Sequence, residues 1–373
     1  YGSLRDRALT EVVLGRALPD GAVTPAIAEG HATRRLADEA YPVLVPAPGR
    51  RAEGVLVTGL GEDDLARLAF FEEAEYGLQP ITVETADGPR EAVCFRGTEK
   101  ARETAADWDF EAWRHHDRAV AIEAARELMD HYGRLPEEEI DRIWPGIMNR
   151  ARQRALAAAE EPVLGRLRSP VAPEDVELLH RERAYAGYLA VEEHRIRHRR
   201  YDGGWSAPLD RSVVLWGDAV TVVPYDPVRG TVLLIEQFRA APAARGDPAP
   251  WVIEVVAGRI DSDEPPAEIA RREAEEEAGL TLGRIEEIGR YYTSPGLAAE
   301  EIVAFAAEAD LPAGEGRHGL AGEHEDIRTI VLDLDEALAA LAAGEVNSGP
   351  ALVSLLWLAR ERERLRADWA GRG

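Results

Sequence analysis

The first hundred residues alternate short apolar runs with turn-forming residues. The runs are VLVPAP (43–48), GVLVTGL (54–60), PITVET (80–85) and EAVCFRG (91–97). Each has the length of a strand and is flanked by glycine or proline. We therefore expect a small β-rich α+β domain over residues 1–100.

Residues 103–161 show longer segments with fewer breaks, a pattern that favours helices. Gly133 and Pro136 separate two helical stretches, and Pro145 is expected to break the second. A linker is then marked by Pro162, Pro170 and Pro173. We expect a helical connector over residues 101–172.

The remainder of the chain, residues 173–373, mixes strand and helix patterns. Strands are expected around RHRRYDG (197–203), VVLWGDAVTVVPYD (213–226), TVLLIEQFR (231–239) and WVIEVVAG (251–258). A long helix follows, then further strands and a C-terminal helix near 350–366. This alternation predicts an α/β/α sandwich.

Length and composition restrict the class of protein. A chain of 373 residues with 45% hydrophobic residues favours two or three globular domains. The net charge of −25 argues against binding to nucleic acid, which is itself a polyanion. Cys94 is the single cysteine, and no secretory leader or apolar run near 20 residues is present, so we expect a soluble cytoplasmic protein that binds no membrane.

The segment 258–280 contains a motif of glutamates, an arginine and glycines at fixed spacing. It reads G-x5-E-x7-R-E-A-x-E-E-x-G-L, and Pro265 and Pro266 suit the first turn of a helix that Gly279 would end. On this helix Glu273, Glu276 and Glu277 share one face, where a hard divalent cation would offset their repulsion. The alternative is a solvated acidic helix face. Arg272 is placed to brace one carboxylate through a bidentate contact.

This spacing resembles the Nudix box, with Ala274 where the family usually carries a larger aliphatic residue. The similarity extends over most of residues 176–365, and Pro295, sixteen residues past Gly279, resembles the ADP-ribose pyrophosphatase branch. The resemblance implies Mg²⁺, with Mn²⁺ as a substitute, held by the carbonyl of Ala257 and by Glu273 and Glu277. Glu276 would assist the metal site and catalysis.

The same resemblance implies the remaining site residues. A loop carboxylate, Glu323 in preference to Glu325, would be catalytic. Arg239, Glu254 and Glu300 would bind substrate. These residues also have simpler explanations: Arg239 as a surface ion pair, solvated loop acids, and a simple turn at Ser294–Gly296. Trp251 and Tyr225 would either stack on adenine or lie in the core, and the core is preferred. The expected reaction is hydrolysis of ADP-ribose to AMP and ribose 5-phosphate; relatives with the same box hydrolyse GDP-mannose.

The segment RIRHRRYDGGWSAPLDRS (195–212) resembles the region that exchanges across a homodimer in this branch. We therefore expect a homodimer, although Ser212 stands where relatives often have Glu. The basic cluster within this segment would form an edge-strand face or a dimer seam; its members are Arg195, Arg197, Arg199 and Arg200.

The N-terminal residues resemble a second family. YGSLRD (1–6), EVVLGR (11–16) and ARLAFFEEAEYG (66–77) are similar to the gamma-glutamylcyclotransferase-like (AIG2-like) fold, a small β-barrel α+β domain. The resemblance implies a substrate loop and an acid/base at Glu72. The loop residues would be Tyr1, Gly2, Ser3 and Leu4.

Three functions follow from the two resemblances. The first is a Mg²⁺-dependent ADP-ribose hydrolase whose N-terminal domain only binds or docks. The second is a bifunctional enzyme that is also a gamma-glutamyl cyclotransferase, and the third is a nucleotide sensor without turnover. The expected fold class is α+β multidomain, and the combination of domains resembles bacterial fusions associated with tellurite resistance.

Overall fold

A computed structural model describes residues 1–36, 41–72, 76–97, 103–160, 167–169, 172–319 and 325–369. The chain forms two compact units, Tyr1–Pro170 and Val171–Gly373, and each is described by itself. In the described part of the chain, no helix is long and apolar enough to cross a bilayer.

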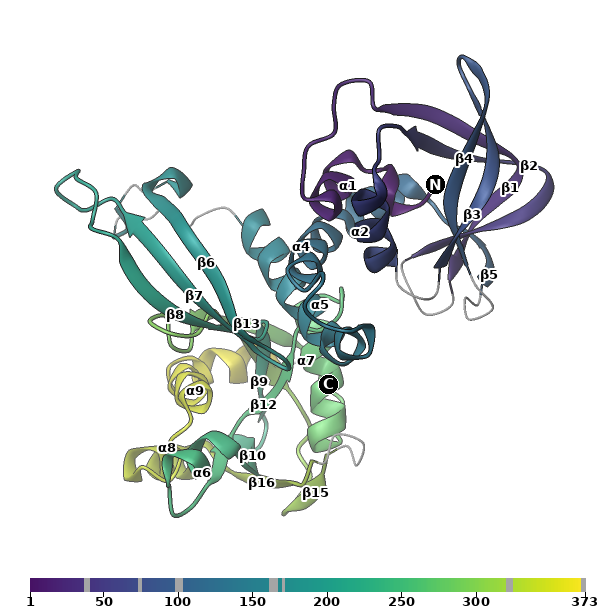
Figure 1. Cartoon of the computed structure of the whole chain (residues 1–373). Helices are drawn as coiled ribbons and strands as arrows, with labels where there is room; N and C mark the ends of the chain where they lie inside the picture. The colour runs from purple at the N-terminus through teal and green to yellow at the C-terminus, as the bar shows by residue number, and fades with distance from the viewer. Residues whose placement is uncertain are drawn as a thin grey trace. The chain divides into compact units, whose positions relative to one another are not determined.

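The first unit contains a strongly curved sheet (Figure 1). Its strands are β1 (Val23–Leu36), β2 (Pro42–Val57), β3 (Tyr76–Thr85), β4 (Gly88–Gly97) and β5 (Glu103–Asp107). Their order is β2-β1-β3-β4, with β5 paired to β1. The run 43–48 and residues 54–57 of the run 54–60, expected as separate strands, lie on the single strand β2, because β1 pairs along most of its length.

Helices pack against one another beside this sheet. They are η1 (Ser3–Arg5), α1 (Arg7–Leu14), α2 (Glu62–Glu72), α3 (Phe110–His116), α4 (Arg118–Met129) and α5 (Glu137–Ala159). Leu9 and Val13 of α1 share a core with Trp113 of α3 and with Ile122 and Ala125 of α4. The segment expected as a connector thus supplies helices to the first unit.

Two expectations about this segment were wrong. Residues 103–107 form strand β5 instead of helix, because Arg34 and Leu36 of β1 pair with Asp107 and Glu103. Helix α5 also runs past Pro145, which is exposed. Ile143 and Ile147, on either side of it, are buried, so packing keeps the helix continuous.

The second unit begins with η2 (Pro173–Asp175) and contains two sheets. The smaller sheet consists of β6 (Val176–Ala186), β7 (Ala190–His198) and β8 (Leu209–Leu215). The larger sheet has the order β13-β14-β9-β10-β16-β15, with β11 on β10 and β12 on β9. Its strands are β9 (Ala219–Asp226), β10 (Thr231–Phe238), β11 (Trp251–Glu254), β12 (Val256–Arg259), β13 (Ile285–Tyr292), β14 (Glu301–Glu308), β15 (Gly316–His318) and β16 (Ile327–Asp333).

Helices cover both faces of the larger sheet, as the sandwich prediction requires (Figure 1). The helices of this unit are α6 (Ala240–Arg245), α7 (Pro266–Ala278), α8 (Leu334–Ala343) and α9 (Gly349–Trp369). Leu233 and Ile235 of β10 pack toward α7, whereas Val232 and Leu234 pack toward α8 and α9. Because both faces of β10 are covered, its sequence is an uninterrupted apolar run.

Candidate functional site

Helix α7 begins and ends where the sequence predicts. Pro265 is its N-cap and Pro266 its first residue, a position where a missing N–H costs no hydrogen bond. Gly279 ends it in the left-handed conformation, with φ of 64°. Ala274 is fully buried against the sheet, so the small residue at this motif position fits close packing between helix and strands.

The three motif carboxylates on α7, Glu273, Glu276 and Glu277, differ in burial. Glu277 is only 3% exposed, and its Oε2 accepts a hydrogen bond from the Ala257 N–H at 3.0 Å. The side chains of Glu273 and Glu276 are 14% and 30% exposed. The bond to Ala257 ties the helix to strand β12 and places Glu277 deepest.

Gly258 leaves room for Glu273. A Cβ atom added at Gly258 would lie 2.1 Å from Cδ of Glu273, far inside van der Waals contact. The glycine of the motif is therefore required by the close approach of this carboxylate to the β12 backbone.

Burial makes the two inner carboxylates hard to ionise. Burial, together with Glu276, Asp261 and Glu325, raises the pKa of Glu273 to about 7, against the opposing effect of Arg272. Burial, with contributions from Glu325 and Glu273, raises the pKa of Glu277 to about 8 despite the Ala257 hydrogen bond. Glu325 thus lies close enough to act on both.

Arg272 contacts several acids at once. Its guanidinium lies 3.2 Å from Glu273 and 3.5 Å from Glu276, and 3.4 and 3.8 Å from Asp261 and Glu264. This differs from the expected bidentate contact with one carboxylate, since four acids surround the arginine. Arg272 therefore holds the outer side of the acidic face together.

Substrate-binding candidates come from other strands. Arg239 Nε donates to Glu254 Oε2 at 2.6 Å, and its charge lowers the pKa of Glu277, so Arg239 lies near the acidic face. Glu300 accepts hydrogen bonds from Trp216 Nε1 at 2.7 Å and from Thr293 Oγ1 at 3.0 Å. Nothing in the sequence pattern had singled out Trp216 as the residue that orients Glu300.

The loop acids are only partly described. Glu325 lies within the described residues and near Glu273 and Glu277, whereas Glu323 lies outside them. The nearby segment 294–298 is a turn, in which Leu297 and Ala298 N–H groups donate to the Ser294 carbonyl. This turn also pairs with strand β8 through a bridge between Val214 and Ala298.

The donors around α7 fit a hard divalent cation. Within the described ranges, no three His, Cys, Asp or Glu side chains are close enough to hold one ion together. The fit rests on oxygen donors: the carboxylates of Glu273 and Glu277 lie against the β12 backbone at Ala257 and Gly258. Two buried carboxylates with raised pKa values are the environment that a bound cation would stabilise in the ionised form.

Two aromatic residues expected in the core have different environments. Tyr225 is fully buried, as expected. Trp251 is 59% exposed and forms an edge-to-face pair with Phe238 at 5.6 Å, so its assignment to the core was wrong. Trp251 lies opposite Phe238 at one end of the β10–β11 ladder, where its side chain is exposed to solvent.

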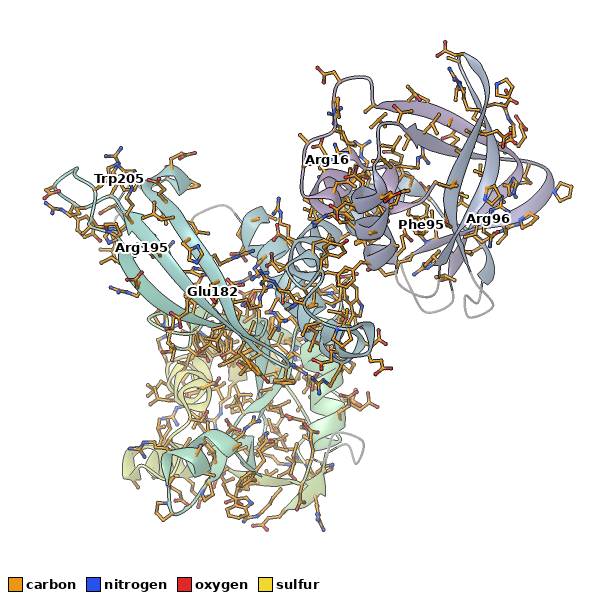
Figure 2. The ribbon with its side chains drawn as sticks, in the orientation of Figure 1. Arg16, Phe95, Arg96, Glu182, Arg195 and Trp205 are labelled. Atoms are coloured by element: carbon orange, nitrogen blue, oxygen red, sulfur yellow. The ribbon has the colours of Figure 1, made fainter. Side chains whose placement is uncertain are left out.

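The basic cluster lies on the small sheet and is largely paired with acids. Arg197 contacts Glu177 at 2.5 Å, and Arg195 lies 3.9 Å from Asp210. Arg197 and Arg199 stack over the ring of Trp205; Trp205 and Arg195 are labelled in Figure 2. Ser212 Oγ donates to Glu193 at 2.8 Å, a cross-strand contact between β8 and β7.

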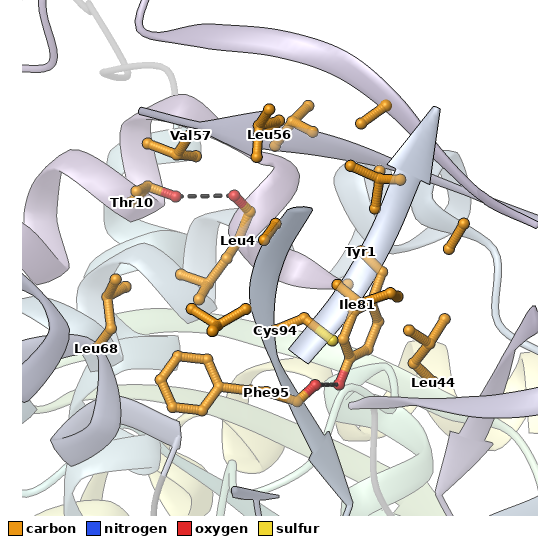
Figure 3. A pocket seen from close by; sticks show the side chains of 18 of the residues that line it. Tyr1, Leu4, Thr10, Leu44, Leu56, Val57, Leu68, Ile81, Cys94 and Phe95 are labelled. Carbon is orange, nitrogen blue, oxygen red and sulfur yellow. Dashed lines mark hydrogen bonds between the residues drawn. The ribbon is translucent and has the colours of Figure 1, made fainter. Parts of the chain in front are cut away.

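The first unit has its own cavity, of about 1060 Å³, at the N-terminal loop (Figure 3). Tyr1, Gly2, Ser3, Leu4 and Glu72 all line it, so the structure brings together the residues that the sequence suggested for this domain. The cavity is also lined by Leu44, Ile81 and Cys94, which surround the Tyr1 ring.

Tyr1 and Gly2 are held tightly. The Tyr1 hydroxyl donates to the Phe95 carbonyl at 2.5 Å, and burial raises the pKa of this phenol well above its ordinary value. Gly2 has a φ of 74°, and a Cβ there would lie 2.9 Å from the Pro42 ring. Only glycine suits this backbone position.

Comparison with known proteins identifies both parts of the chain. A NUDIX domain model matches residues 215–352, and a model described as gamma-glutamyl cyclotransferase, AIG2-like, matches residues 1–114. A solved structure described as an ADP compounds hydrolase aligns with a TM-score of 0.41 at 18% identity, over 54% of this chain and 99% of that one.

Curated relatives are matched along most of their own length, over 40–52% of this chain. The ADP-ribose pyrophosphatase of Escherichia coli (strain K12) is 37% identical over 196 residues, covering 52% of this chain and 93% of the relative. The Haemophilus influenzae ADP-ribose pyrophosphatase is 33% identical, covering 52% and 91%. A GDP-mannose pyrophosphatase of Citrobacter koseri is 38% identical, covering 40% and 76%. The chain therefore belongs to the Nudix hydrolases and carries an AIG2-like domain before its Nudix domain.

Proposed function

We propose that the second unit hydrolyses the diphosphate bond of ADP-ribose, giving AMP and ribose 5-phosphate. The observation that carries this proposal is the convergence of three segments on Glu277. Glu273 of α7, Arg239 after β10 and Glu325 before β16 all lie near enough to change its pKa. Cleavage of a diphosphate needs such a combination of acids and a guanidinium.

The residues divide the chemistry among themselves. Arg239 faces the diphosphate and offsets its negative charge, exchanging its contact with Glu254 for one with a phosphate oxygen. A carboxylate of the 323–325 segment orients a water and takes its proton as the water oxygen attacks phosphorus. The bond from that phosphorus to the bridging oxygen breaks, and the bridging oxygen leaves with the other phosphate. Glu300, held by Trp216, binds the substrate beside this point.

Ala257, Glu273 and Glu277 would hold Mg²⁺ or Mn²⁺, with Glu276 assisting. The cation, when bound, supplies the positive charge that neutralises and polarises the diphosphate. The chain's part is to keep the two inner carboxylates in place through the Ala257 N–H and through the space at Gly258.

ADP-ribose is favoured over GDP-mannose by the extent of the similarity. The two ADP-ribose pyrophosphatases above are matched along 93% and 91% of their length, whereas the GDP-mannose pyrophosphatase is matched along 76%.

We also propose that the unit works as a homodimer through the small sheet. Several apolar side chains of this region are exposed, among them Leu178 at 51%, Tyr185 at 55% and Tyr188 at 68%. Strand β8 bridges to the turn that precedes Glu300, so a partner seated on this sheet would lie close to the substrate.

A panel of nucleoside diphosphate sugars tests the hydrolysis. The full chain is incubated with Mg²⁺ and each substrate, and products are identified by mass. AMP and ribose 5-phosphate should form from ADP-ribose faster than GMP forms from GDP-mannose. Absence of AMP would refute the proposal, and faster GDP-mannose cleavage would replace the substrate.

Matched variants of α7 test the site. Glu277→Gln should lose at least about a hundredfold in kcat, as removal of a group acting on developing charge does. Glu275→Gln, an exposed neighbour on the same helix, should keep wild-type activity. Equal activity in both variants would remove Glu277 from the site.

A second function, gamma-glutamyl cyclotransfer, is favoured for the first unit by its cavity. Glu72 lines the same cavity as Tyr1–Leu4, and its charge raises the pKa of the Tyr1 phenol. In this reaction the α-amine of a gamma-glutamyl group attacks its own side-chain carbonyl. Glu72 takes a proton from the attacking α-amine and gives it to the amine that departs from the side-chain carbonyl. The cyclised product is 5-oxoproline.

Release of 5-oxoproline tests this second function. A panel of gamma-glutamyl amino acids and amines is incubated with the wild type, with Glu72→Gln and with Glu62→Gln. Glu62 lies on the same helix, is exposed and does not line the cavity. Release by the wild type and Glu62→Gln alone supports Glu72 as acid/base. No release from any substrate would indicate a binding domain.

A further inference from the structure

A second hollow of the first unit lies away from the cavity of Tyr1 and Glu72. It is a groove of about 380 Å³, a size at the lower end of ligand sites, which span about 300–1,000 Å³. Four arginines line it, Arg5, Arg7, Arg114 and Arg118. They come from η1, α1, α3 and α4, segments that only folding brings together.

The one acid that lines the groove, Asp6, already has hydrogen-bond partners for both of its carboxylate oxygens. Asp6 is the one acid among the lining residues, all of which the structure describes. It is 9% exposed, and its Oδ1 accepts a hydrogen bond from the Leu9 N–H at 3.0 Å as the cap of α1. Its Oδ2 accepts one from Arg118 Nε at 2.6 Å. Asp6 therefore balances Arg118 and leaves the other three arginines uncompensated within the lining.

The other three arginines have their partners outside the groove. Arg5 lies over the ring of Phe110 at 4.3 Å and reaches Glu53, whose side chain is 77% exposed, at 3.3 Å. Arg114 reaches Glu111, which is 63% exposed, at 3.4 Å. Arg7 Nε donates to Glu11 at 2.8 Å, and its Nη2 donates to the Leu18 carbonyl. The pairs of Arg5 and Arg114 are exposed ion pairs, which contribute about 0–1 kcal/mol each, so an anion can displace them.

The groove concentrates positive charge in a chain whose net charge is −25. Like charges brought together repel, and an anion between them removes that repulsion. Forked guanidiniums match the oxygens of a phosphate group, and several can share one such group. A group with two negative charges suits three arginines whose acid partners lie outside the groove better than a carboxylate does.

We propose that this groove binds a phosphate group, either inorganic phosphate or the phosphate of a monoester. Phe110 and the exposed His115 also line the groove, and His115 provides a further polar contact for the remainder of a monoester. The hydrolysis proposed above releases two phosphate monoesters, AMP and ribose 5-phosphate, but the groove's charge does not depend on that reaction.

Calorimetry of the full chain with inorganic phosphate tests the site. The titration is run in EDTA, without Mg²⁺, against chloride of equal ionic strength. Arg114→Gln and Arg7→Gln should each weaken phosphate binding about tenfold, the loss expected for one charge-assisted contact. Arg126→Gln is the matched control, because Arg126 is equally exposed and also pairs with a glutamate three residues before it.

The titrations give different results if the groove binds phosphate and if it does not. Saturable phosphate binding that Arg114→Gln weakens and Arg126→Gln keeps supports the site. Absence of saturable binding in the wild type, or equal binding in all variants, overturns it. Thermal melts in chloride check that the variants fold. Titrations with AMP, ribose 5-phosphate and adenosine then show whether the groove prefers a phosphate monoester to free phosphate, with adenosine as the ligand that lacks a phosphate. ADP-ribose turnover of the same variants is measured separately and reports on the hydrolysis.

Discussion

Gly258 shows how one atom can decide where a carboxylate of the acidic face lies. Its backbone passes so close to Glu273 that a methyl group there would overlap the carboxylate. Gly279, by contrast, is required for its left-handed φ of 64°, which ends helix α7. The motif therefore needs glycine at these two positions for different physical reasons: lack of space at Gly258 and a left-handed backbone at Gly279.

Gly258→Ala should lower activity. The added methyl must displace the end of the flexible Glu273 side chain, so its main effect is on the position of this carboxylate. We expect a marked loss of ADP-ribose turnover with little change in Tm. Gly349→Ala, where an added Cβ meets nothing within 4 Å, is the control and should change neither. Unchanged turnover in Gly258→Ala would show that Glu273 can move without loss.

Glu277 is expected to destabilise the metal-free protein. Burial raises its pKa to about 8, above the ordinary value of 4.5, so keeping it ionised costs stability that grows as pH rises from the lower to the higher value. In EDTA, Glu277→Gln should therefore raise Tm at about pH 9, with a smaller difference at about pH 6. Melting curves at the two pH values measure this.

Addition of Mg²⁺ supplies the control for that prediction. The wild type should gain stability with the metal, because the cation offsets the buried charge, and Glu277→Gln should gain less. An equal gain in both proteins would contradict a role for Glu277 as a ligand.

At the scale of elements, helix α5 carries an internal proline. Pro145 lacks the N–H that would bond to the carbonyl four residues earlier, and it is exposed, so its own packing does not compensate. The helix persists because Ile140, Ile143 and Ile147 are buried.

Pro145→Ala should stabilise the first unit. Proline inside a helix costs about 3 kcal/mol relative to alanine, and its restriction of the unfolded chain returns about 1 kcal/mol. We expect a net gain of about 2 kcal/mol in the free energy of unfolding. Denaturant titration measures it, with Leu156→Ala, an exposed site on the same helix, as the control. A loss of stability would mean that the proline serves the fold.

Strands were harder to predict than the box helix. The limits of α7 follow from prolines and a glycine within the segment itself. Strand β5 depends on its pairing with β1, about seventy residues earlier, and such pairing is not visible in a local pattern.

At the scale of the whole molecule, the small sheet bears on the dimer proposal. Leu178→Asp and Tyr185→Asp place charges on exposed apolar positions of this sheet. If a second copy covers them, both variants should be monomers by light scattering and show a raised KM for ADP-ribose. Leu156→Asp, on α5, should remain like the wild type. A wild type that is already monomeric would refute the proposal.

The sequence by itself determined the reaction class and the outline of the fold. The spacing of Glu273, Glu276 and Glu277 places them on one helix face, because helical periodicity is a local property. Composition and the apolar strand runs likewise predicted an α+β chain with a sandwich in its second half, since covered strands must be apolar on both faces.

The tertiary structure decided which of these residues matter most. It buried Glu277 and left Glu276 partly exposed, surrounded Arg272 with four acids, and left Trp251 at the surface. It also brought Arg239 and Glu325 to Glu277 from distant segments. Burial and electrostatic proximity depend on which segments pack together, and that is a property of the folded chain rather than of any stretch of it.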